Sequence, residues 1–255
     1  MNDKKILVAG GSGMVGRSVL GALLKRFPSA HLRAVHYRTD TDLPVHPRIE
    51  WVRADLRSRD YCRRVAASCH WAVLAAAHTS GSRGQAAEPW KALDDNAVMN
   101  THLLEALHFA GVRRVVCIGT ASVYQDIEGA IREDELDWNQ DPHPTHFGVG
   151  WAMRFTEKLC RFWHEKTGME TVIVRAANVF GPYAAFDPQH SNVIPALIRK
   201  SVDRMDPFEV WGSPSVARDV IYSEDFADCV SLLLDAESIK FDVFNVGAGK
   251  VTTVG

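Results

Sequence analysis

Three glycines near the start of the chain have the type and spacing that suit a phosphate-binding turn. Gly10, Gly13 and Gly16 follow the apolar run 6–9 and precede the amphipathic run 18–27, an order that predicts a strand, a tight turn and a helix. Glycine lets a pyrophosphate come close to backbone N–H groups, and the positive end of the helix dipole faces the phosphates. We therefore predict a dinucleotide site whose phosphate-binding residues are Gly10, Ser12, Gly13, Met14, Val15 and Arg17.

The ends of the next predicted strands carry residues that suit the rest of a dinucleotide. Strand 31–38 ends at Arg38, and no acidic residue follows it before Asp40. An acid at this point selects a ribose 2′-hydroxyl, whereas an arginine accommodates a 2′-phosphate, so NADP is slightly favoured over NAD unless Arg38 is an ordinary solvated loop residue. Asp55 ends strand 49–56, where its carboxylate accepts from an adenine amino group. The other predicted cofactor contacts on this side are Leu56, Ala75, Ala76, Ala77 and Asn96.

A second group of polar residues follows a later strand. Thr120, Ser122 and Tyr124 come at the end of the apolar run 115–119, where a hydroxyl can contact a substrate. Ligands of a parallel sheet bind at the carboxyl ends of its strands. We therefore expect Thr120 and Ser122 to face the same cleft as the glycine turn.

The elements that must position these residues alternate between strands and helices. This alternation predicts an α/β protein with a Rossmann-type, doubly wound parallel sheet. Residues 1–180 are predicted to form a dinucleotide-binding domain, and residues 181–255 a small lobe interleaved with it. The predicted strands are 31–38, 49–56, 71–78, 115–120, 171–180, 208–211 and 219–222, and the later helices are 90–110, 150–166, 193–202 and 224–234.

Composition narrows the possible partners. The formal net charge of −2 provides no basic field, so nucleic acid and anionic membranes are poor candidates. No apolar run approaches 18 residues, and residues 1–5 lead directly into a strand, so we expect neither a membrane span nor a signal peptide. The five cysteines contain no close Cys-x-x-Cys pair. We therefore expect a reduced, cytoplasmic protein without a metal site.

Several longer motifs resemble those of a known family. The motifs are the runs 10–16, 142–145, 178–182, 186–200 and 210–219, which together span almost the whole chain. They resemble the extended short-chain dehydrogenase/reductases, and within them the NAD-dependent, nucleotide-sugar epimerase/dehydratase group that includes GDP-L-fucose synthase. The resemblance implies an NAD(P)-dependent enzyme that acts on a sugar attached to a nucleoside diphosphate.

The same resemblance assigns residues to the substrate. Arg218 and Lys200 would pair with the diphosphate through charge-assisted hydrogen bonds. Alternatively, Arg218 pairs with Asp219 or Asp225, and Trp211 belongs to the core of the lobe. Asn178 would contact both substrate and cofactor. The full set of implied substrate residues is Asn178, Asn192, Val193, Lys200, Trp211 and Arg218.

The chain departs from the family at the residues that move protons. Family members have a catalytic Ser or Thr at the end of the fifth strand, and Thr120 occupies that position here. They also have a Tyr-x-x-x-Lys motif on the following helix, where this chain has Val149 and Met153. The phenol transfers a proton while the nicotinamide carries the hydride, and the ammonium lowers the phenol pKa. The epimerases of this group also use a cysteine and a histidine where this chain has Ser122 and Asn192.

Two hypotheses follow from this departure. In the first, the protein is an enzyme in which other groups move the protons, and the preferred groups are His146 and His190 because imidazole titrates near neutrality. In the second, the protein is a non-catalytic sensor or partner subunit that still binds cofactor and nucleotide sugar. The titratable candidates for the first hypothesis are His78, Cys117, Tyr124, Glu133, His143, His146, Asp187 and His190.

The quaternary structure is also predicted from the resemblance. Relatives commonly pair through two long helices, which correspond here to 90–110 and 150–166. Phe155, Leu159, Phe162 and Trp163 form an apolar stripe that suits such a four-helix contact, although a stripe facing the core would look the same. We therefore expect a homodimer.

Overall fold

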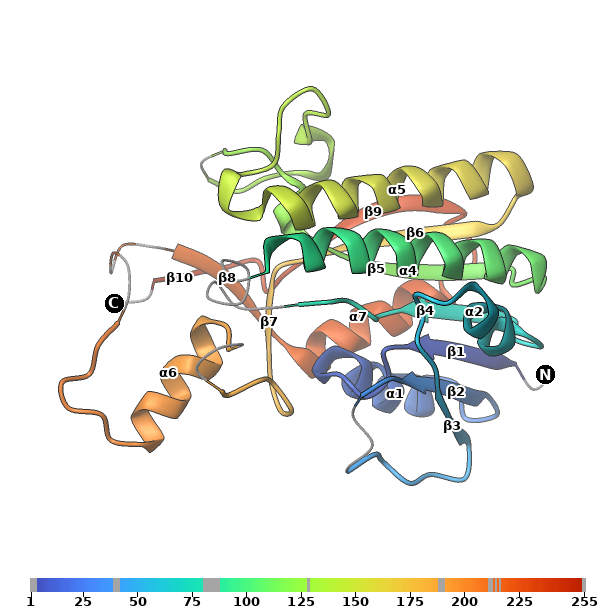
Figure 1. Cartoon of the computed structure of the whole chain (residues 1–255), viewed down its shortest axis with the longest axis horizontal. Helices are drawn as coiled ribbons and strands as arrows, with labels where there is room; N and C mark the ends of the chain where they lie inside the picture. Colours follow the sequence, from blue (N-terminus) through green and yellow to red (C-terminus); the bar gives the residue numbers. More distant parts are fainter. Residues whose placement is uncertain are drawn as a thin grey trace.

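A seven-stranded parallel sheet forms the centre of the protein in a computed structural model (Figure 1). The structure describes residues 4–38, 42–79, 88–127, 129–187, 191–210, 213, 215 and 217–253. The strand order is β3-β2-β1-β4-β5-β6-β9, and all six neighbouring pairs are parallel. The strands are β1 (Lys5–Ala9), β2 (His31–His36), β3 (Ile49–Arg53), β4 (Trp71–Leu74), β5 (Arg114–Thr120), β6 (Glu170–Ala176) and β9 (Phe241–Val246).

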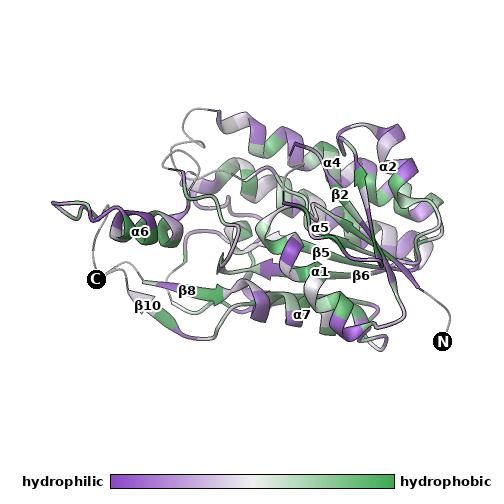
Figure 2. Ribbon diagram, turned by 90° about the horizontal axis from the view of Figure 1, so that it is seen from below, coloured by the Kyte–Doolittle hydropathy of each residue, from purple (hydrophilic) through white to green (hydrophobic). Residues whose placement is uncertain are grey.

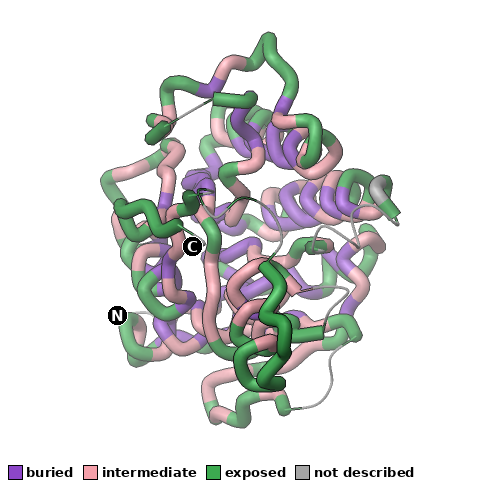
Figure 3. Tube along the Cα trace, turned by 90° about the vertical axis from the view of Figure 1, so that its left-hand side faces the viewer, coloured by how far each residue is buried: buried purple, intermediate pink, exposed green. Residues whose placement is uncertain are grey.

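Helices cover both faces of this sheet, as Figure 1 shows. Helices α2 (Arg59–Ala66), α4 (Pro89–Phe109) and α5 (Phe147–Thr167) pack on one face, and α1 (Met14–Arg26) and α7 (Ser223–Asp235) on the other. Two apolar clusters lie between these layers, and the buried residues follow the sheet and the inward helix faces (Figure 3). The predicted Rossmann-type fold is thus confirmed. Within the described residues, no helix is long and apolar enough to cross a membrane.

A smaller sheet carries the rest of the chain. It consists of β7 (Asn178–Phe180), β8 (Ala217–Tyr222) and β10 (Val251–Thr253), in the order β10-β8-β7. Helix α6 (Val193–Val202) stands beyond it, apart from the main sheet, and has both apolar and polar residues on its surface (Figure 2). Three short 3₁₀ helices, η1 (Ala121–Val123), η2 (Glu133–Glu135) and η3 (Pro144–His146), lie between β5 and α5.

Three details of the predicted elements were wrong or missing. The single strand expected over 171–180 is divided, because the chain leaves the main sheet at Ala177 and Asn178 pairs with Val220 of the small sheet. Residues 208–210 form no strand, because they have no ladder partner, and the Glu209 carbonyl instead accepts from the Lys200 side chain. The elements α2, β9 and β10 were not predicted, and each of them is short, with 8, 6 and 3 residues.

A buried arginine joins the main sheet to α7. The Arg114 side chain is fully buried and donates to Glu170 Oε2 at 2.9 Å. It also donates to the carbonyl oxygens of Leu233, Ala236 and Ile239, at or just beyond the end of α7, at 2.7–2.8 Å. These carbonyls lack partners within the helix, so Arg114 caps α7 while it balances a buried carboxylate.

We predict that Arg114→Met destabilises the protein by about 3 kcal/mol, because it removes the side-chain donor to the Leu233 and Ile239 carbonyls and the closest buried partner of Glu170. Arg113→Met is the matched control, since the Arg113 side chain is 55% exposed, its partner Glu237 is also exposed, and Glu170 keeps Arg114 and Lys240 as partners. Urea unfolding would measure both variants. Equal midpoints for the two variants would contradict the anchoring role of Arg114.

Candidate functional site

The glycine turn joins β1 to α1 at the carboxyl edge of the sheet. Gly10 has a φ of +77°, and a Cβ there would lie 2.6 Å from the Ala76 backbone. A Cβ on Gly16 would lie 2.1 Å from the Gly10 carbonyl oxygen, so strand and helix approach as closely as their backbones allow. Gly13 differs, because its missing Cβ would meet only the Gly10 oxygen, at 3.5 Å. The turn therefore leaves open space beside Gly13, at the N-terminus of α1.

A groove of about 270 Å³ lies over this turn, at the carboxyl ends of β1 to β4. Of the residues predicted to contact a cofactor, Gly10, Ser12, Gly13, Arg38, Asp55, Leu56 and Ala75–Ala77 line the groove. Its other lining residues are Val35, His36, Tyr37, Ala54, Arg57, His78, Asp95 and Met99. The shape and the exposed backbone fit a dinucleotide whose pyrophosphate lies at the N-terminus of α1.

Other residues predicted to contact the cofactor do not line the groove. Met14 and Val15 are half-buried in the first turn of α1. The Arg17 side chain donates to the carbonyls of Ser12 and Asp42 at 3.0 and 2.6 Å and lies 4.4 Å from the centre of the Tyr183 ring. Arg17 thus connects the glycine turn with two neighbouring loops.

Asn96 holds one wall of the groove in place through hydrogen bonds. Its amide is 1% exposed, accepts from the His78 N–H at 2.7 Å and donates to the Ala92 and His78 carbonyls. These bonds hold the loop that follows β4, which forms one wall of the groove. Asn96 therefore shapes this wall of the groove through its hydrogen bonds to the loop backbone.

The adenosine end of the groove contains a charged cluster that the sequence did not predict. Arg57 contacts both oxygens of Asp55, at 3.0 and 2.8 Å, and reaches Asp95 Oδ1 at 3.3 Å. Hydrogen bonding from the Arg57 side chain lowers the pKa of Asp55 to about 2. The only feature of the sequence that could have indicated this cluster was the position of Arg57, two residues after Asp55. The Asp55 carboxylate is thus already engaged by an arginine at the place where an adenine amino group was expected.

Thr120 and Ser122 form a compact hydroxyl pair at the end of β5. The Ser122 N–H donates to Thr120 Oγ1 at 3.1 Å, and the two hydroxyl oxygens are 3.2 Å apart. The first turns of α5 pack directly on this segment, because a Cβ on Gly150 would lie 2.6 Å from the Ser122 carbonyl and 2.5 Å from Pro142. Glycine at this position therefore lets α5 begin beside the hydroxyl pair.

Val149 and Met153 lie in a small apolar cluster on the inward side of α5. The other members of this cluster are Val123, Tyr124, Ile131 and Leu136, and Met153 is only 4% exposed. An ammonium group at Met153 would lose its hydration in these surroundings. The segment between β5 and α5 therefore forms an apolar environment at the two positions that differ from the Tyr-x-x-x-Lys pattern.

The Tyr124 hydroxyl is engaged in hydrogen bonds with two other side chains. Its hydroxyl accepts from Arg175 at 2.6 Å and donates to Asn245 Oδ1 at 2.7 Å. The side chain is 4% exposed, and burial raises the pKa of its phenol. Tyr124 is thus a structural tyrosine, unsuited to proton transfer with a ligand in the groove.

His146 has the properties of a neutral imidazole near α5. It immediately precedes the helix, and its Nδ1 atom is buried with no hydrogen-bond partner in the described part of the chain. Burial lowers its pKa, and the neighbouring charges of His143 and Arg218 lower it further. His146 therefore stays neutral to a lower pH than an ordinary histidine. His190 lies outside the described residues.

The small sheet positions the residues that were assigned to a substrate. The Asn178 amide donates to the Asp219 carbonyl at 3.0 Å, and Arg218 is exposed on β8, opposite Thr252. The carboxylate of Asp219 accepts from the N–H groups of Ala248 and Gly249, so Asp219 holds the turn before β10.

The remaining residues of the small lobe lie on or near α6. Asn192 and Val193 are at its N-terminus, and the Lys200 ammonium donates to the Glu209 carbonyl at 2.7 Å. That bond fixes the segment after α6 and engages part of the ammonium's donor capacity. Trp211 lies outside the described residues.

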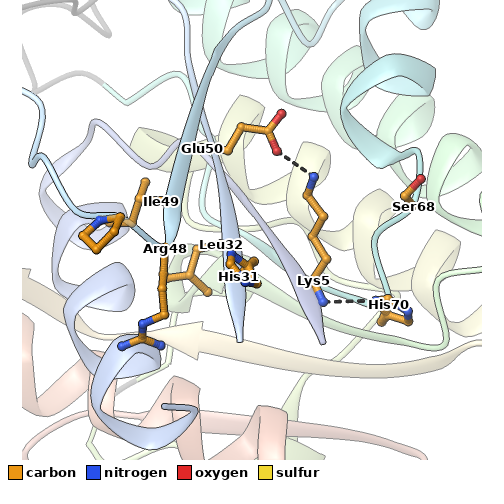
Figure 4. A pocket seen from close by; sticks show the side chains of 9 residues that line it. Lys5, His31, Leu32, Arg48, Ile49, Glu50, Ser68 and His70 are labelled. Atoms are coloured by element: carbon orange, nitrogen blue, oxygen red, sulfur yellow. Dashed lines mark hydrogen bonds and ion pairs between the residues drawn. The ribbon is translucent and has the colours of Figure 1, made fainter. Parts of the chain in front are cut away.

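A second hollow, of about 370 Å³, lies at the opposite end of the main sheet (Figure 4). It is lined by residues at the amino ends of the strands, including Lys5, His31 and Glu50. Lys5 pairs with Glu50 at 2.6 Å, and its backbone N–H donates to the His70 ring. These polar groups satisfy one another, so the groove over the glycine turn remains the better candidate site. Among the described residues, no cluster of His, Cys, Asp or Glu could hold a metal ion.

Comparison with known proteins identifies the family. Residues 6–247 match the model of the NAD dependent epimerase/dehydratase family. The chain belongs to this family. A nicotinamide dinucleotide is accordingly its class of cofactor, and the glycine turn and groove described above fit such a group.

The chain is also similar to curated relatives in sequence and to solved structures in fold. The chain is 26% identical over 253 residues to a GDP-L-fucose synthase of Sinorhizobium fredii, covering 98% of this chain and 76% of the relative. It is also 26% identical to a dTDP-4-dehydro-6-deoxy-D-allose reductase of Streptomyces bikiniensis, with 98% and 78% coverage. Its fold is similar to that of the epimerase Mth375 of Methanothermobacter thermautotrophicus, with a TM-score of 0.87, 23% identity, and 99% and 74% coverage.

We predict that Gly13→Ala weakens binding of the cofactor while leaving the fold intact. A methyl group fits beside Gly13, where it meets only the Gly10 oxygen at an ordinary contact distance of 3.5 Å, but it enters the space above the helix N-terminus. A steric cost of about 1–3 kcal/mol weakens binding roughly 5- to 150-fold. Gly21→Ala, within the same helix, is the control, because nothing lies within 4 Å of its Cβ. Calorimetric titration with NADPH and NADH tests both variants, and wild-type affinity in Gly13→Ala would refute this placement of the pyrophosphate.

Proposed function

We propose that this protein is an NAD(P)-dependent enzyme that transforms the sugar of a nucleoside-diphosphate sugar, with His146 as its proton carrier. The main support is the half-buried imidazole of His146, whose Nδ1 has no hydrogen-bond partner among the residues that the structure describes. It lies three residues before Val149, the position that holds a tyrosine in the family pattern. Epimerase, dehydratase and reductase chemistry all require such a proton transfer beside a hydride transfer.

The other residues have complementary roles in this proposal. Gly10, Gly13 and the N-terminus of α1 bind the pyrophosphate, and the Thr120–Ser122 pair orients a sugar hydroxyl. When bound, the nicotinamide supplies or accepts the hydride. His146 takes a proton from the sugar oxygen or returns one to it. In the small lobe, Arg218 pairs with the diphosphate together with Lys200, while Asn178, Asn192, Val193 and Trp211 contact the nucleotide sugar.

Relatives support the choice of substrate. The names of the curated relatives include synthases and reductases that act on GDP- and dTDP-linked sugars. Among solved structures of the same fold, MoeE5 was determined with UDP-glucose and NAD, at a TM-score of 0.81 and 24% identity. We therefore place the substrate of this protein in the class of nucleoside-diphosphate sugars.

We further propose that NADP is preferred over NAD. The strand β2 is followed by Tyr37 and Arg38 at the rim of the groove. Arg38 is exposed, stacks 5.5 Å from the centre of the Tyr37 ring, and forms no ion pair with the described residues. An uncompensated guanidinium at this point suits a ribose 2′-phosphate.

A non-catalytic role is the second candidate, and the apolar cluster around Met153 favours it. Met153 and Val149 cannot transfer protons, while the cofactor groove is retained. In that case the protein would bind cofactor and nucleotide sugar as a sensor or as the partner of an active subunit. Binding of a nucleotide sugar without turnover, across UDP-, GDP- and dTDP-linked sugars, would support this alternative.

We also propose a domain organisation and a cellular compartment for this protein. We assign residues 1–180 to cofactor binding and 181–255 to the nucleotide-sugar lobe, although α7 and β9 return to the main sheet. The five cysteines are free, and four of them are buried. Free thiols suit a reducing compartment, so we propose the cytoplasm.

We predict that His146→Ala lowers kcat about 10²- to 10⁴-fold, the usual contribution of a positioned acid or base. Because the pKa of His146 is lowered, the acid limb of the wild-type rate should lie below the ordinary histidine range near 6.5 and should disappear in the variant. His164→Ala, near the far end of α5, is the control. If His146→Ala and His190→Ala both keep wild-type turnover, the proton carrier is a different residue.

We also propose a homodimer that pairs α4 and α5 of each copy into four helices. These helices expose Leu93, Val98, Phe155 and Phe162, each more than one-third accessible.

We predict that Phe155→Glu dissociates the dimer, because it would bury a charge in the contact. Val202→Glu on α6 is the control, and sedimentation velocity distinguishes the two states. A monomeric wild type would refute the proposal.

A further inference from the structure

Two carboxylates line the end of the groove where the extra phosphate of NADP would bind. Asp55 follows β3 and Asp95 lies on α4, and both border the groove near Tyr37 and Arg38. A 2′-phosphate carries negative charge, so unmasked carboxylates at this end would repel it. A site that accepts NADP must therefore neutralise these two groups.

Arg57 is placed to neutralise both of them. Its guanidinium makes a two-point contact with Asp55 and a third contact with Asp95 Oδ1 at 3.3 Å. The same group lies 3.3 Å from the Tyr37 hydroxyl, and its centre is 5.6 Å from the centre of the ring. Arg57 thus lies between the two acids and the aromatic rim of the groove.

The geometry leaves Arg38 as the cation available to a ligand. The Arg57 guanidinium is engaged by Asp55 and Asp95, whereas Arg38 contacts only the Tyr37 ring among the described residues. The Tyr37 ring therefore contacts two arginines. Arg57 is paired with the two acids, and Arg38 is exposed at the rim of the groove. Because Arg57 is paired with carboxylates and Arg38 is exposed, the two arginines have different roles.

We propose that Arg57 determines cofactor specificity by masking Asp55 and Asp95, so that Arg38 can bind the 2′-phosphate of NADP. This inference rests on the preference for NADP proposed above. It assigns to Arg57 a positioning role, since Arg57 acts through the two carboxylates and does not itself contact the phosphate. NADH lacks that phosphate, so its binding should depend little on the masking.

The first test compares cofactor affinities by calorimetric titration. In Arg57→Gln the affinity for NADPH should fall about tenfold or more, while that for NADH changes less than about threefold. The fragments 2′,5′-ADP and 5′-AMP should show the same contrast, because they differ only in the 2′-phosphate. Arg59→Gln, on the adjacent surface of α2, is the matched control and should leave both affinities unchanged, as its ion pair is with Glu105.

A double variant separates masking from direct contact. If Arg57 acts by masking, adding Asp95→Asn to Arg57→Gln removes one unmasked charge and should restore a large part of the NADPH affinity. If Arg57 contacts the phosphate directly, the double variant should bind NADPH no better than Arg57→Gln, and the proposal is overturned.

The remaining outcomes are also decisive. Wild-type NADPH affinity in Arg57→Gln overturns the masking role, and an equal loss for NADH and NADPH shows that Arg57 only supports the fold of the groove. A wild-type protein that binds NADH but not NADPH overturns both this inference and the NADP preference, while leaving the dinucleotide site intact. A protein that binds neither cofactor refutes the proposed function itself.

Discussion

The close approach of two backbones at Gly10 and Gly16 is the constraint on which the site depends. A Cβ on Gly16 would lie 2.1 Å from the Gly10 carbonyl oxygen and would push α1 away from the turn. A Cβ on Gly10 would lie 2.6 Å from the Ala76 backbone and would separate the turn from the loop after β4. This contact brings the helix N-terminus to the carboxyl edge of β1. The adjacent parallel strands end at the same edge, and their terminal residues therefore line one groove.

The region beyond β5 has a different physical character. There α5 begins against Ser122, but its inward positions Val149 and Met153 belong to an apolar cluster closed by the segment between β5 and α5. A lysine in place of Met153 would be buried among hydrocarbon side chains. Val149 and Met153 therefore lie in hydrocarbon surroundings, unlike the residues that line the groove over the glycine turn.

A buried polar network keeps that region rigid. Arg175 forms a two-point ion pair with Glu157 at 2.9 Å and donates to the Tyr124 hydroxyl and the Glu133 carbonyl. The Asn245 N–H donates to the Glu133 side chain at 2.7 Å. Together these bonds connect α5, β6 and β9 with the segment that covers the apolar cluster. Because buried ion pairs are costly to separate, the segment has one preferred position.

The sequence by itself determined the fold class, the glycine turn and the order of most elements, because these follow from local periodicity and from glycines that no other residue can replace. From the sequence we also predicted roles for Asp55 and Thr120 and a departure from the family pattern at Val149 and Met153. Only the tertiary structure decided how distant residues pair. It brought Arg57 to Asp95, enclosed Tyr124 between Arg175 and Asn245, and divided the predicted strand 171–180 between two sheets. Such pairings depend on contacts across 50 or more residues in some cases, and local sequence patterns contain no information about them.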